Sequence, residues 1–300
     1  MSDALCLDVE TTFARYEALR NRLPAAGFDL VPQQAATLED VAERFEGFVL
    51  DAFGVLNVGD TPIPGAVERM ARLRAMGKRL CVLTNASSYT RAAAEAKYRR
   101  LGFDFGPDEV VSSRDIAVAH LDAVAPGAHW AAIAAEGDDF ADIPAKVSDA
   151  MSNPVLFYRA DAILFLSSAR WTPAWQDRLV SALEALPRPV VVANPDLVAP
   201  REGGLTVEPG FWGHDLADRT GAVPHFFGKP YAAAFEAALD RLGPGRHAMV
   251  GDTLHTDILG GRAAGLGTVL VADHGLFAGH RVADFVARSG IRPDAIVATT

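Results

Sequence analysis

The sequence predicts an α/β protein with a doubly wound parallel sheet, into which a second α/β unit is inserted. Apolar runs that end abruptly in a polar residue alternate with amphipathic helical segments, the pattern of a parallel sheet covered on both faces. The pattern restarts in a different form between about residues 105 and 222 and then resumes. Because ligands of open α/β sheets bind beyond the carboxyl ends of the strands, polar residues at those ends are the first candidates for a site.

Length and composition narrow the function classes. The chain has 300 residues, enough for two domains, and 50% of them are hydrophobic, so a large core is expected. The formal net charge of −10 argues against a nucleic-acid-binding surface, which needs clustered Lys and Arg. The first ten residues lack the order of a signal peptide, and no apolar run is long enough to cross a membrane. Cys6 and Cys81 imply no disulfide framework, which favours a reducing, cytoplasmic location.

Residues 1–45 are expected to form a helical extension. Leu19 and Leu23 share a helix face, and the stretch from Thr37 to Asp40 resembles a capping start for a helix over 41–45. Since the segment shows no chemistry of its own, we predict that it packs in front of the first strand.

The first expected strand delivers a carboxylate to the sheet edge. The apolar run 48–50 ends at Asp51, and Gly54 lets the backbone turn away. A helix between Gly65 and Gly77, a strand over 80–83 and a helix over 89–101 follow. The second strand ends at Thr84 and Asn85, so these side chains are expected at the same edge as Asp51.

The middle block is expected to be a second α/β unit. Its predicted elements are strands over 130–135, 162–166 and 190–193, a helix over 171–186, and a Gly- and Pro-rich loop over 199–210. The strand over 190–193 ends at Asn194, Pro195 and Asp196, which places two polar side chains at the edge of this second sheet.

The first pattern resumes after the middle block. Lys229 precedes a predicted helix over 231–242, and a strand over 247–252 ends in Asp252. The next predicted elements are a helix over 256–264, which contains Asp257, a strand over 267–271 and a short strand near 295–297.

Six polar residues therefore fall at ends of strands or helices of one sheet: Asp51, Thr84, Asn85, Lys229, Asp252 and Asp257. Taken singly, each is explained as a helix cap or as a surface charge. Taken together, two strand-terminal carboxylates suit Mg²⁺, which prefers a few hard oxygen ligands. A carboxylate can form an aspartyl-phosphate, and lysine, hydroxyl and amide donors offset the charge of a transferring phosphoryl group.

The chain resembles the haloacid dehalogenase superfamily, in particular the class with a large α/β cap that is similar to NagD-like, phosphoglycolate and pyridoxal phosphate phosphatases. The resemblance covers about residues 46–275. It rests on motifs at 50–56, 63–66 with 77–78 and 83–88, 193–196, 228–230 and 251–258. Five motifs in the correct order are much more specific than one short match.

The resemblance implies a fold with three parts. A Rossmann-like core would comprise residues 46–104 and 223–300, and an α/β cap, residues 105–222, would close over the site and select the substrate. Residues 1–45 would be the N-terminal extension. Caps of this class often take part in dimers, so a homodimer through the cap is one expectation.

The resemblance also implies catalytic roles in the core. Asp51 would be the nucleophile and a metal ligand. Thr84 and Asn85 would bind the phosphate. Lys229 would contact the phosphate, orient Asp51 and neutralise charge.

The remaining implied roles concern the metal and the cap. Asp252 would bind Mg²⁺, Asp257 would bind it or its waters, and position 53 would supply a backbone carbonyl. Asn194 and Asp196 would lie where the cap meets the core.

Phe53 departs from the pattern of these phosphatases, which carry a second Asp two residues after the nucleophile as general acid and base. A backbone carbonyl ligand survives the change, whereas proton transfer does not. Since general acid–base catalysis is worth about 10²–10⁴-fold, hydrolysis of ordinary alkyl phosphates is expected to be weak or specialised.

Three functions follow from these residues. The leading hypothesis is a Mg²⁺-dependent phosphatase that acts on a small phosphorylated metabolite. The first alternative is a haloacid dehalogenase, since an aromatic residue at position 53 is similar to those enzymes, although they need no metal and both Asp252 and Asp257 are present here. The second alternative is a protein that binds a phosphorylated metabolite without catalysis.

Overall fold

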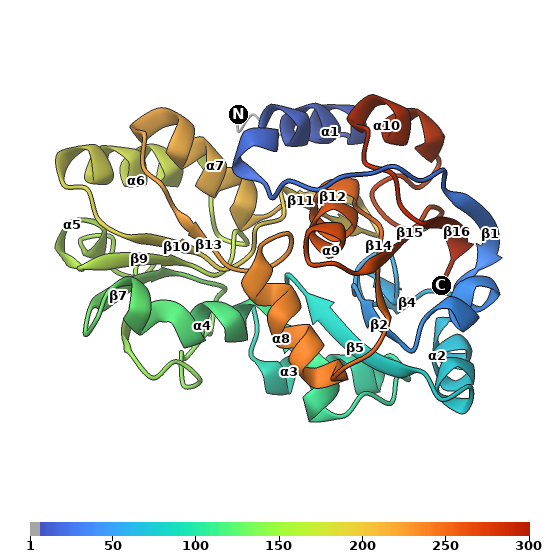
Figure 1. Ribbon diagram of the computed structural model, residues 1–300. Helices are drawn as coiled ribbons and strands as arrows, with labels where there is room; N and C mark the ends of the chain where they lie inside the picture. Colours follow the sequence, from blue (N-terminus) through green and yellow to red (C-terminus); the bar gives the residue numbers. More distant parts are fainter. Residues whose placement is uncertain (1–6) are drawn as a thin grey trace.

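The computed structural model describes residues 7–300, so Cys6 lies outside the described residues. Two parallel sheets lie side by side (Figure 1), each flanked by helices. The larger sheet has seven strands in the order β1-β16-β15-β14-β2-β5-β6. Its strands are β1 Gln33–Thr37, β2 Gly47–Leu50, β5 Arg79–Thr84, β6 Val110–Ser112, β14 His247–Gly251, β15 Gly267–Val271 and β16 Ala295–Thr299. The predicted fold class, a doubly wound parallel sheet with an inserted α/β cap, is confirmed.

The strand order reverses at β2. β5 and β6 extend the sheet on one side of β2, and β14, β15 and β16 extend it on the other. Such a reversal opens a crevice beyond the carboxyl ends of the central strands. Asp51 directly follows β2, so it lies at this crevice.

The second sheet has five parallel strands in the order β13-β10-β9-β7-β8. Its strands are β7 His129–Ile133, β8 Lys146–Asp149, β9 Ala162–Phe165, β10 Val190–Val192 and β13 His225–Phe226. Two antiparallel hairpins complete the strands. One joins β3 Asn57–Val58 to β4 Thr61–Pro62, and the other joins β11 Val198–Arg201 to β12 Gly204–Val207.

The helices cover both faces of the larger sheet because its strands alternate their side chains. Phe48 and Leu50 pack in one apolar cluster, with helices α2 and α3. Val49 packs in another, with Phe235 of α8. The α-helices are α1 Val9–Ala18, α2 Ala66–Ala75, α3 Arg91–Arg100, α4 Ser113–Val124, α5 Leu156–Arg159, α6 Pro173–Ala185, α7 Pro209–Thr220, α8 Ala232–Leu242, α9 Leu259–Ala263 and α10 Val282–Ser289. Short 3₁₀ helices span Arg20–Arg22, Leu38–Arg44 and Pro107–Glu109, and a π-helical turn spans Leu254–Ile258. None of the described helices is long and apolar enough to span a membrane.

Two local predictions are wrong. The extension over 1–45 is not wholly helical, because β1 pairs in parallel with β16 and so covers an edge that would otherwise expose unpaired backbone groups. The stretch over 199–210 is not a plain loop, because most of it forms the β11–β12 hairpin. Of the Gly and Pro residues that suggested a loop, Gly203 lies at the hairpin tip, whereas Pro200 and Gly204 lie within the two strands. The capping start at Thr37 is confirmed, since its backbone N–H bonds to Asp40 at 2.8 Å, although the helix is 3₁₀.

The two sheets also refine the domain limits. β6 lies in the stretch predicted as cap but pairs with β5 of the larger sheet, and β13 lies in the stretch predicted as core but pairs with β10. Strand pairing therefore indicates that the chain passes from core to cap, and back again, a few residues after the predicted limits of 105 and 222. We retain the division into core and cap as a proposal, with β6 assigned to the core and β13 to the cap.

Candidate active site

Three carboxylates converge at the crevice of the larger sheet. Asp51 follows β2, Asp252 follows the neighbouring strand β14, and Asp257 lies in the π-helical turn after β14. One carboxylate oxygen of each lies within 4.8 Å of the others. Because parallel neighbouring strands end at one edge, Asp51 and Asp252, 201 positions apart in sequence, are brought together.

Lys229 joins this cluster. Its Nζ lies 2.6 Å from Asp51 Oδ1 and 2.8 Å from Asp257 Oδ1, and the residue is 1% exposed. Burial alone would lower the pKa of Lys229, but the carboxylates of Asp257 and Asp51 raise it above its usual value. The side chain therefore stays an ammonium ion.

The carboxylates are not fully compensated by this lysine. Burial raises the pKa of Asp51 to about 6, although Lys229 opposes the shift, and burial raises the pKa of Asp252 well above its usual value. Gly275 approaches so closely that an added Cβ would clash with Asp252 Oδ2, and the next backbone N–H, of Leu276, donates to that oxygen at 2.6 Å. A rigid set of hard oxygen donors with excess negative charge fits a divalent cation such as Mg²⁺.

Thr84 and Asn85, at the end of β5, differ in the hydrogen bonds that their side chains make. Thr84 is 1% exposed, and its Oγ1 accepts a bond from the N–H of Ala86 at 3.2 Å. The Asn85 side chain is engaged with protein groups: its Nδ2 donates to Asp196 Oδ1 and to the carbonyl of Lys229, and its Oδ1 accepts from the N–H of Lys229. Any phosphate contact of Asn85 therefore falls to its main chain, and its side chain holds the Lys229 loop.

The two polar residues after β10 lie against the core. Asp196 bonds Asn85 at 2.9 Å. Asn194 accepts from the N–H of Asp196 at 2.9 Å and donates to Glu208 Oε2 at 3.1 Å. Through Asn85, these hydrogen bonds connect the end of the five-stranded sheet to the loop that contains Lys229.

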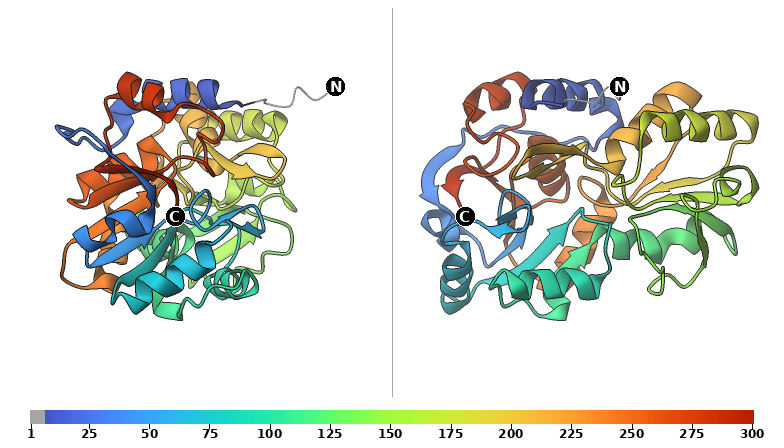
Figure 2. Two further views of the ribbon diagram at one scale, coloured as in Figure 1. Left: turned by 90° about the vertical axis from the view of Figure 1, so that its right-hand side faces the viewer. Right: turned by 180° about the vertical axis from the view of Figure 1, so that it is seen from behind.

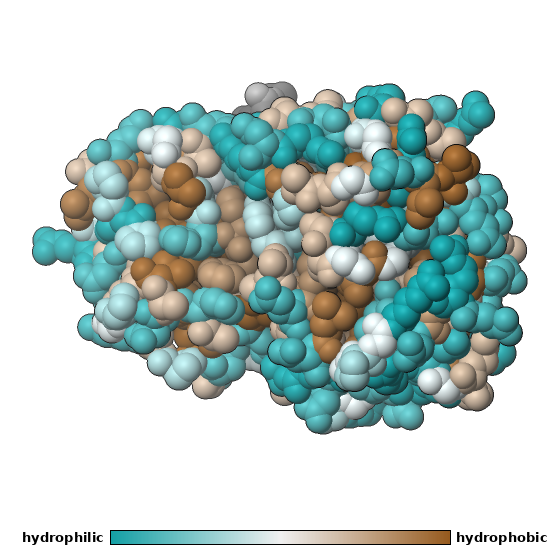
Figure 3. Space-filling view, viewed as in Figure 1, coloured by the Kyte–Doolittle hydropathy of each residue, from teal (hydrophilic) through white to brown (hydrophobic). Residues whose placement is uncertain are grey.

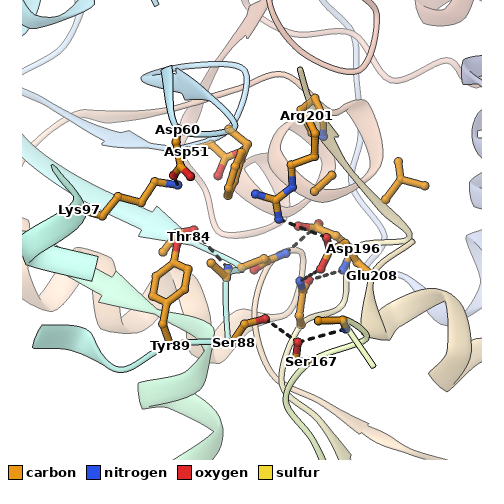
Figure 4. A pocket seen from close by; sticks show the side chains of 18 of the residues that line it. Asp51, Asp60, Thr84, Ser88, Tyr89, Lys97, Ser167, Asp196, Arg201 and Glu208 are labelled. Carbon is orange, nitrogen blue, oxygen red and sulfur yellow. Dashed lines mark hydrogen bonds and ion pairs between the residues drawn. The ribbon is translucent and has the colours of Figure 1, made fainter. Parts of the chain in front are cut away.

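A cavity of about 620 Å³ opens in front of these groups. Figure 4 shows that core residues and cap residues line it together. Lys97 and Tyr89 come from the core, and Arg201 and Glu208 from the cap side. This volume suits a small metabolite.

Sequence reasoning missed the cationic residues of the cavity. Ala93, Ala96, Lys97 and Arg100 lie on one face of α3, and all four line the cavity. Their spacing of three and four residues was the available signal. Arg201 was not predicted as a site residue because its hairpin was interpreted as a loop.

Phe53 contacts two of these cations. Lys97 Nζ lies 4.4 Å from the centre of the Phe53 ring, and Arg201 Cζ lies 4.5 Å from it. Cations at such distances from a ring face are attracted by its quadrupole. The Phe53 side chain therefore makes an aromatic contact with both cations.

The N-terminal extension reaches the site through α1. The Tyr16 ring stacks on His255 at 4.9 Å, and Glu17 Oε1 lies 2.5 Å from His255 Nε2. The Tyr16 hydroxyl accepts the N–H of Leu197 at 3.1 Å. Figure 2 shows α1 beside α10, where Phe13 packs on Phe285. The extension thus connects the π-helical turn that carries Asp257 to the segment after Asp196, a pairing too distant in sequence to predict.

Comparison with known proteins agrees with this geometry. A model of haloacid dehalogenase-like hydrolases matches residues 48–142, and a second, HAD-hydrolase-like model matches residues 226–299. A glycerol-3-phosphate phosphatase of Gallus gallus is 33% identical over 289 residues, covering 87% of this chain and 91% of that protein. The chain belongs to the haloacid dehalogenase-like hydrolases. The resemblance to the capped, NagD-like class is confirmed.

Solved structures of this family share the architecture. A p-nitrophenyl phosphatase from Archaeoglobus fulgidus is 25% identical, with a TM-score of 0.70 over 85% of this chain and 96% of that one. A glycerol phosphate phosphatase from Mycobacterium tuberculosis, solved in complex with magnesium, is 28% identical, with a TM-score of 0.67 over 85% of this chain and 75% of that one.

Proposed function

We propose that this chain is a Mg²⁺-dependent phosphatase that hydrolyses a small phosphorylated metabolite through an aspartyl-phosphate intermediate. The observation that carries the proposal is the buried cluster in which Lys229 bonds both Asp51 and Asp257 while Asp252 lies within 4.8 Å. The relatives named as phosphatases support the same reaction class. Bound Mg²⁺ would draw in the phosphate group by charge.

Asp51 is held in an orientation suited to attack. Its Oδ1 accepts from Lys229 Nζ at 2.6 Å and from the N–H of Ala52 at 2.7 Å, which leaves Oδ2 to act as the nucleophile. Oδ2 would bond to phosphorus as the bond to the leaving oxygen breaks. Water would then attack the same phosphorus, releasing phosphate and restoring the carboxylate. Lys229 and Thr84 would offset charge on the phosphoryl oxygens.

The metal would be held by Asp51, Asp252 and Asp257 with the carbonyl of Phe53. The fit rests on the excess of buried carboxylate over the one lysine and on the close backbone around Asp252. Asn85, Asn194 and Asp196 would position the Lys229 loop and the cap rather than contact the phosphoryl group through their side chains.

The experiment is hydrolysis of 4-nitrophenyl phosphate with Mg²⁺ and with EDTA, with the Asp51→Asn variant as control. We expect Mg²⁺-dependent release of nitrophenol that the variant lacks. Equal rates with EDTA, or full activity in Asp51→Asn, would contradict the proposal. Chloride release from a 2-haloacid would favour the dehalogenase alternative, and binding of phosphate monoesters without turnover would favour the non-catalytic one.

Two further parts of the proposal concern location and assembly. A cytoplasmic location rests on cysteine usage. A homodimer through the cap rests on the class of cap, and Val155, Tyr158 and Leu186 are exposed apolar residues of the cap stretch. Figure 3 shows apolar residues over this end of the molecule, at the left of the view. Sedimentation of the purified protein at several concentrations tests the dimer.

A further inference from the structure

Three cationic residues line the cavity, in addition to five acidic ones: Lys97, Arg100 and Arg201 beside Asp51, Asp60, Asp196, Glu208 and Asp252. Lys97 and Arg100 extend from one face of α3, and Arg201 extends from the β11–β12 hairpin. Figure 4 shows Lys97 and Arg201 entering the cavity from opposite sides. None of these three residues belongs to the cluster around Lys229, so that cluster does not explain them.

Lys97 is a buried ammonium with few partners. The residue is 7% exposed, and burial lowers its pKa, an effect that Asp60 opposes. Its Nζ donates to the carbonyl of Gly59 at 3.2 Å. The Asp60 carboxylate lies 3.6 Å away and is 89% exposed, so water screens its charge. Since an ammonium has three donors, Lys97 retains capacity for an anion.

Arg201 is also incompletely paired. Its Nε donates to Thr206 Oγ1 at 3.4 Å, and the Glu208 carboxylate lies 3.6 Å from its Nη2, longer than a charge-assisted hydrogen bond. The hairpin tip is fixed, because Glu202 accepts from the N–H of Asp60 at 3.0 Å and from Thr61 Oγ1 at 3.3 Å. The Arg201 guanidinium therefore lies at the cavity with N–H donors that remain available to a ligand.

Phe53 contacts both cations, each of which also has one carboxylate 3.6 Å away, Asp60 for Lys97 and Glu208 for Arg201. The ring attracts both, at 4.4 and 4.5 Å, through its face and uses none of their N–H donors. An aspartate at this position would pair with both cations and consume those donors. In addition, the Tyr89 hydroxyl is buried at the cavity and has no hydrogen-bond partner within residues 7–300.

We propose that Lys97 and Arg201, which both contact the Phe53 ring, form a subsite for a second anionic group of the substrate, a carboxylate or a further phosphate. This inference rests on the proposed function, since the first anionic group would be the phosphoryl group at Asp51. The substrate would then be a compact phosphate ester that carries another anion a few bonds away. The cation pair would select it over esters with a neutral tail.

Non-hydrolysable phosphonates separate this subsite from catalysis. Propylphosphonate, 3-phosphonopropanoate and propane-1,3-bisphosphonate differ only at the far end, which is neutral, a carboxylate or a second phosphonate. Their affinity for the wild-type protein is measured by calorimetry with Mg²⁺. We expect at least one of the two compounds with an anionic tail to bind about 10–100-fold more tightly than propylphosphonate, the range of one charge-assisted hydrogen bond. The better of the two identifies the anion.

Variants assign the preference to the named residues. Lys97→Met and Arg201→Gln should each remove most of the preference, whereas Arg99→Met, a charge loss on the exposed side of α3, should retain it. Arg201 is 38% exposed, so its variant tests the subsite even where Lys97→Met impairs folding. Equal affinity of all three phosphonates, or a preference that survives both variants, would overturn the inference. A preference without hydrolysis of any phosphate monoester would instead refute the proposed function and leave the subsite standing.

Discussion

Replacing Phe53 with Asp tests what the aromatic ring at this position does in the proposed phosphatase. The substitution introduces a side chain that can transfer protons, and such transfer is worth about 10²–10⁴-fold in general acid–base catalysis. The structure nevertheless predicts a small gain. Both Lys97 Nζ and Arg201 Cζ lie within 4.5 Å of the ring centre, so a carboxylate at position 53 would be flanked by two cations.

The pKa of the new carboxyl group determines how much of the normal benefit of proton transfer is lost. One cation at 4–6 Å lowers a carboxyl pKa by about 1–3 units, from a usual value of about 3.9. At pH 7 the protonated fraction would therefore fall from roughly 10⁻³ to roughly 10⁻⁴ or lower. We expect Phe53→Asp to raise kcat on alkyl phosphates by less than about tenfold, far below the range that proton transfer normally supplies.

The assay is the slope of log kcat against the pKa of the leaving alcohol, over a series of alkyl and aryl phosphates. Wild type should show a steep slope because its leaving group departs unprotonated. Phe53→Asp should stay nearly as steep, and Phe53→Asp combined with Lys97→Met should be flatter. A gain of about 10²-fold or more in the single variant would refute the reasoning about the flanking cations. A flat wild-type slope would show that another group already supplies the proton.

Four other outcomes follow from the structure. Asp252→Asn should weaken Mg²⁺ binding, measured by calorimetry. The loss of affinity should exceed the roughly 10–100-fold caused by removing a group that supports a metal ligand. Equal affinity in the variant would exclude Asp252 as a ligand. Asp51→Asn should lower kcat by about 10⁴–10⁶-fold, the range for loss of a catalytic group, while phosphate binding persists. Tyr16→Phe should lower the free energy of unfolding by about 1–3 kcal/mol, because the buried Leu197 N–H loses its acceptor, and an unchanged value in urea would argue against that bond. Hydrogen bonds from Arg114 lower the pKa of Asp142, so this carboxylate stabilises the fold fully above its unfolded pKa near 3.8 and progressively less as the pH falls below it. The free energy of unfolding should therefore fall less steeply with decreasing pH in Asp142→Asn than in the wild type. An identical pH dependence would contradict this linkage.

The sequence by itself determined the order of the elements and the polar residues at their ends. Apolar runs before Asp51, Thr84 and Asp252 become β2, β5 and β14, because buried parallel strands require continuous hydrophobic segments. Glycine and capping residues mark the ends of several helices. These signals are local, so they place the motifs on one sheet edge whatever distant elements pack around it.

Tertiary structure alone decided the remaining features of the site. Lys97 and Arg201 meet at Phe53 only because a core helix and a cap hairpin fold toward one cavity. Tyr16 stacks on His255 across more than two hundred residues of sequence. Side-chain periodicity shows which face of an element is buried, but not which distant element covers it. Such pairings depend on how sheets and helices pack together, and this information is spread over the whole chain rather than contained in any one segment.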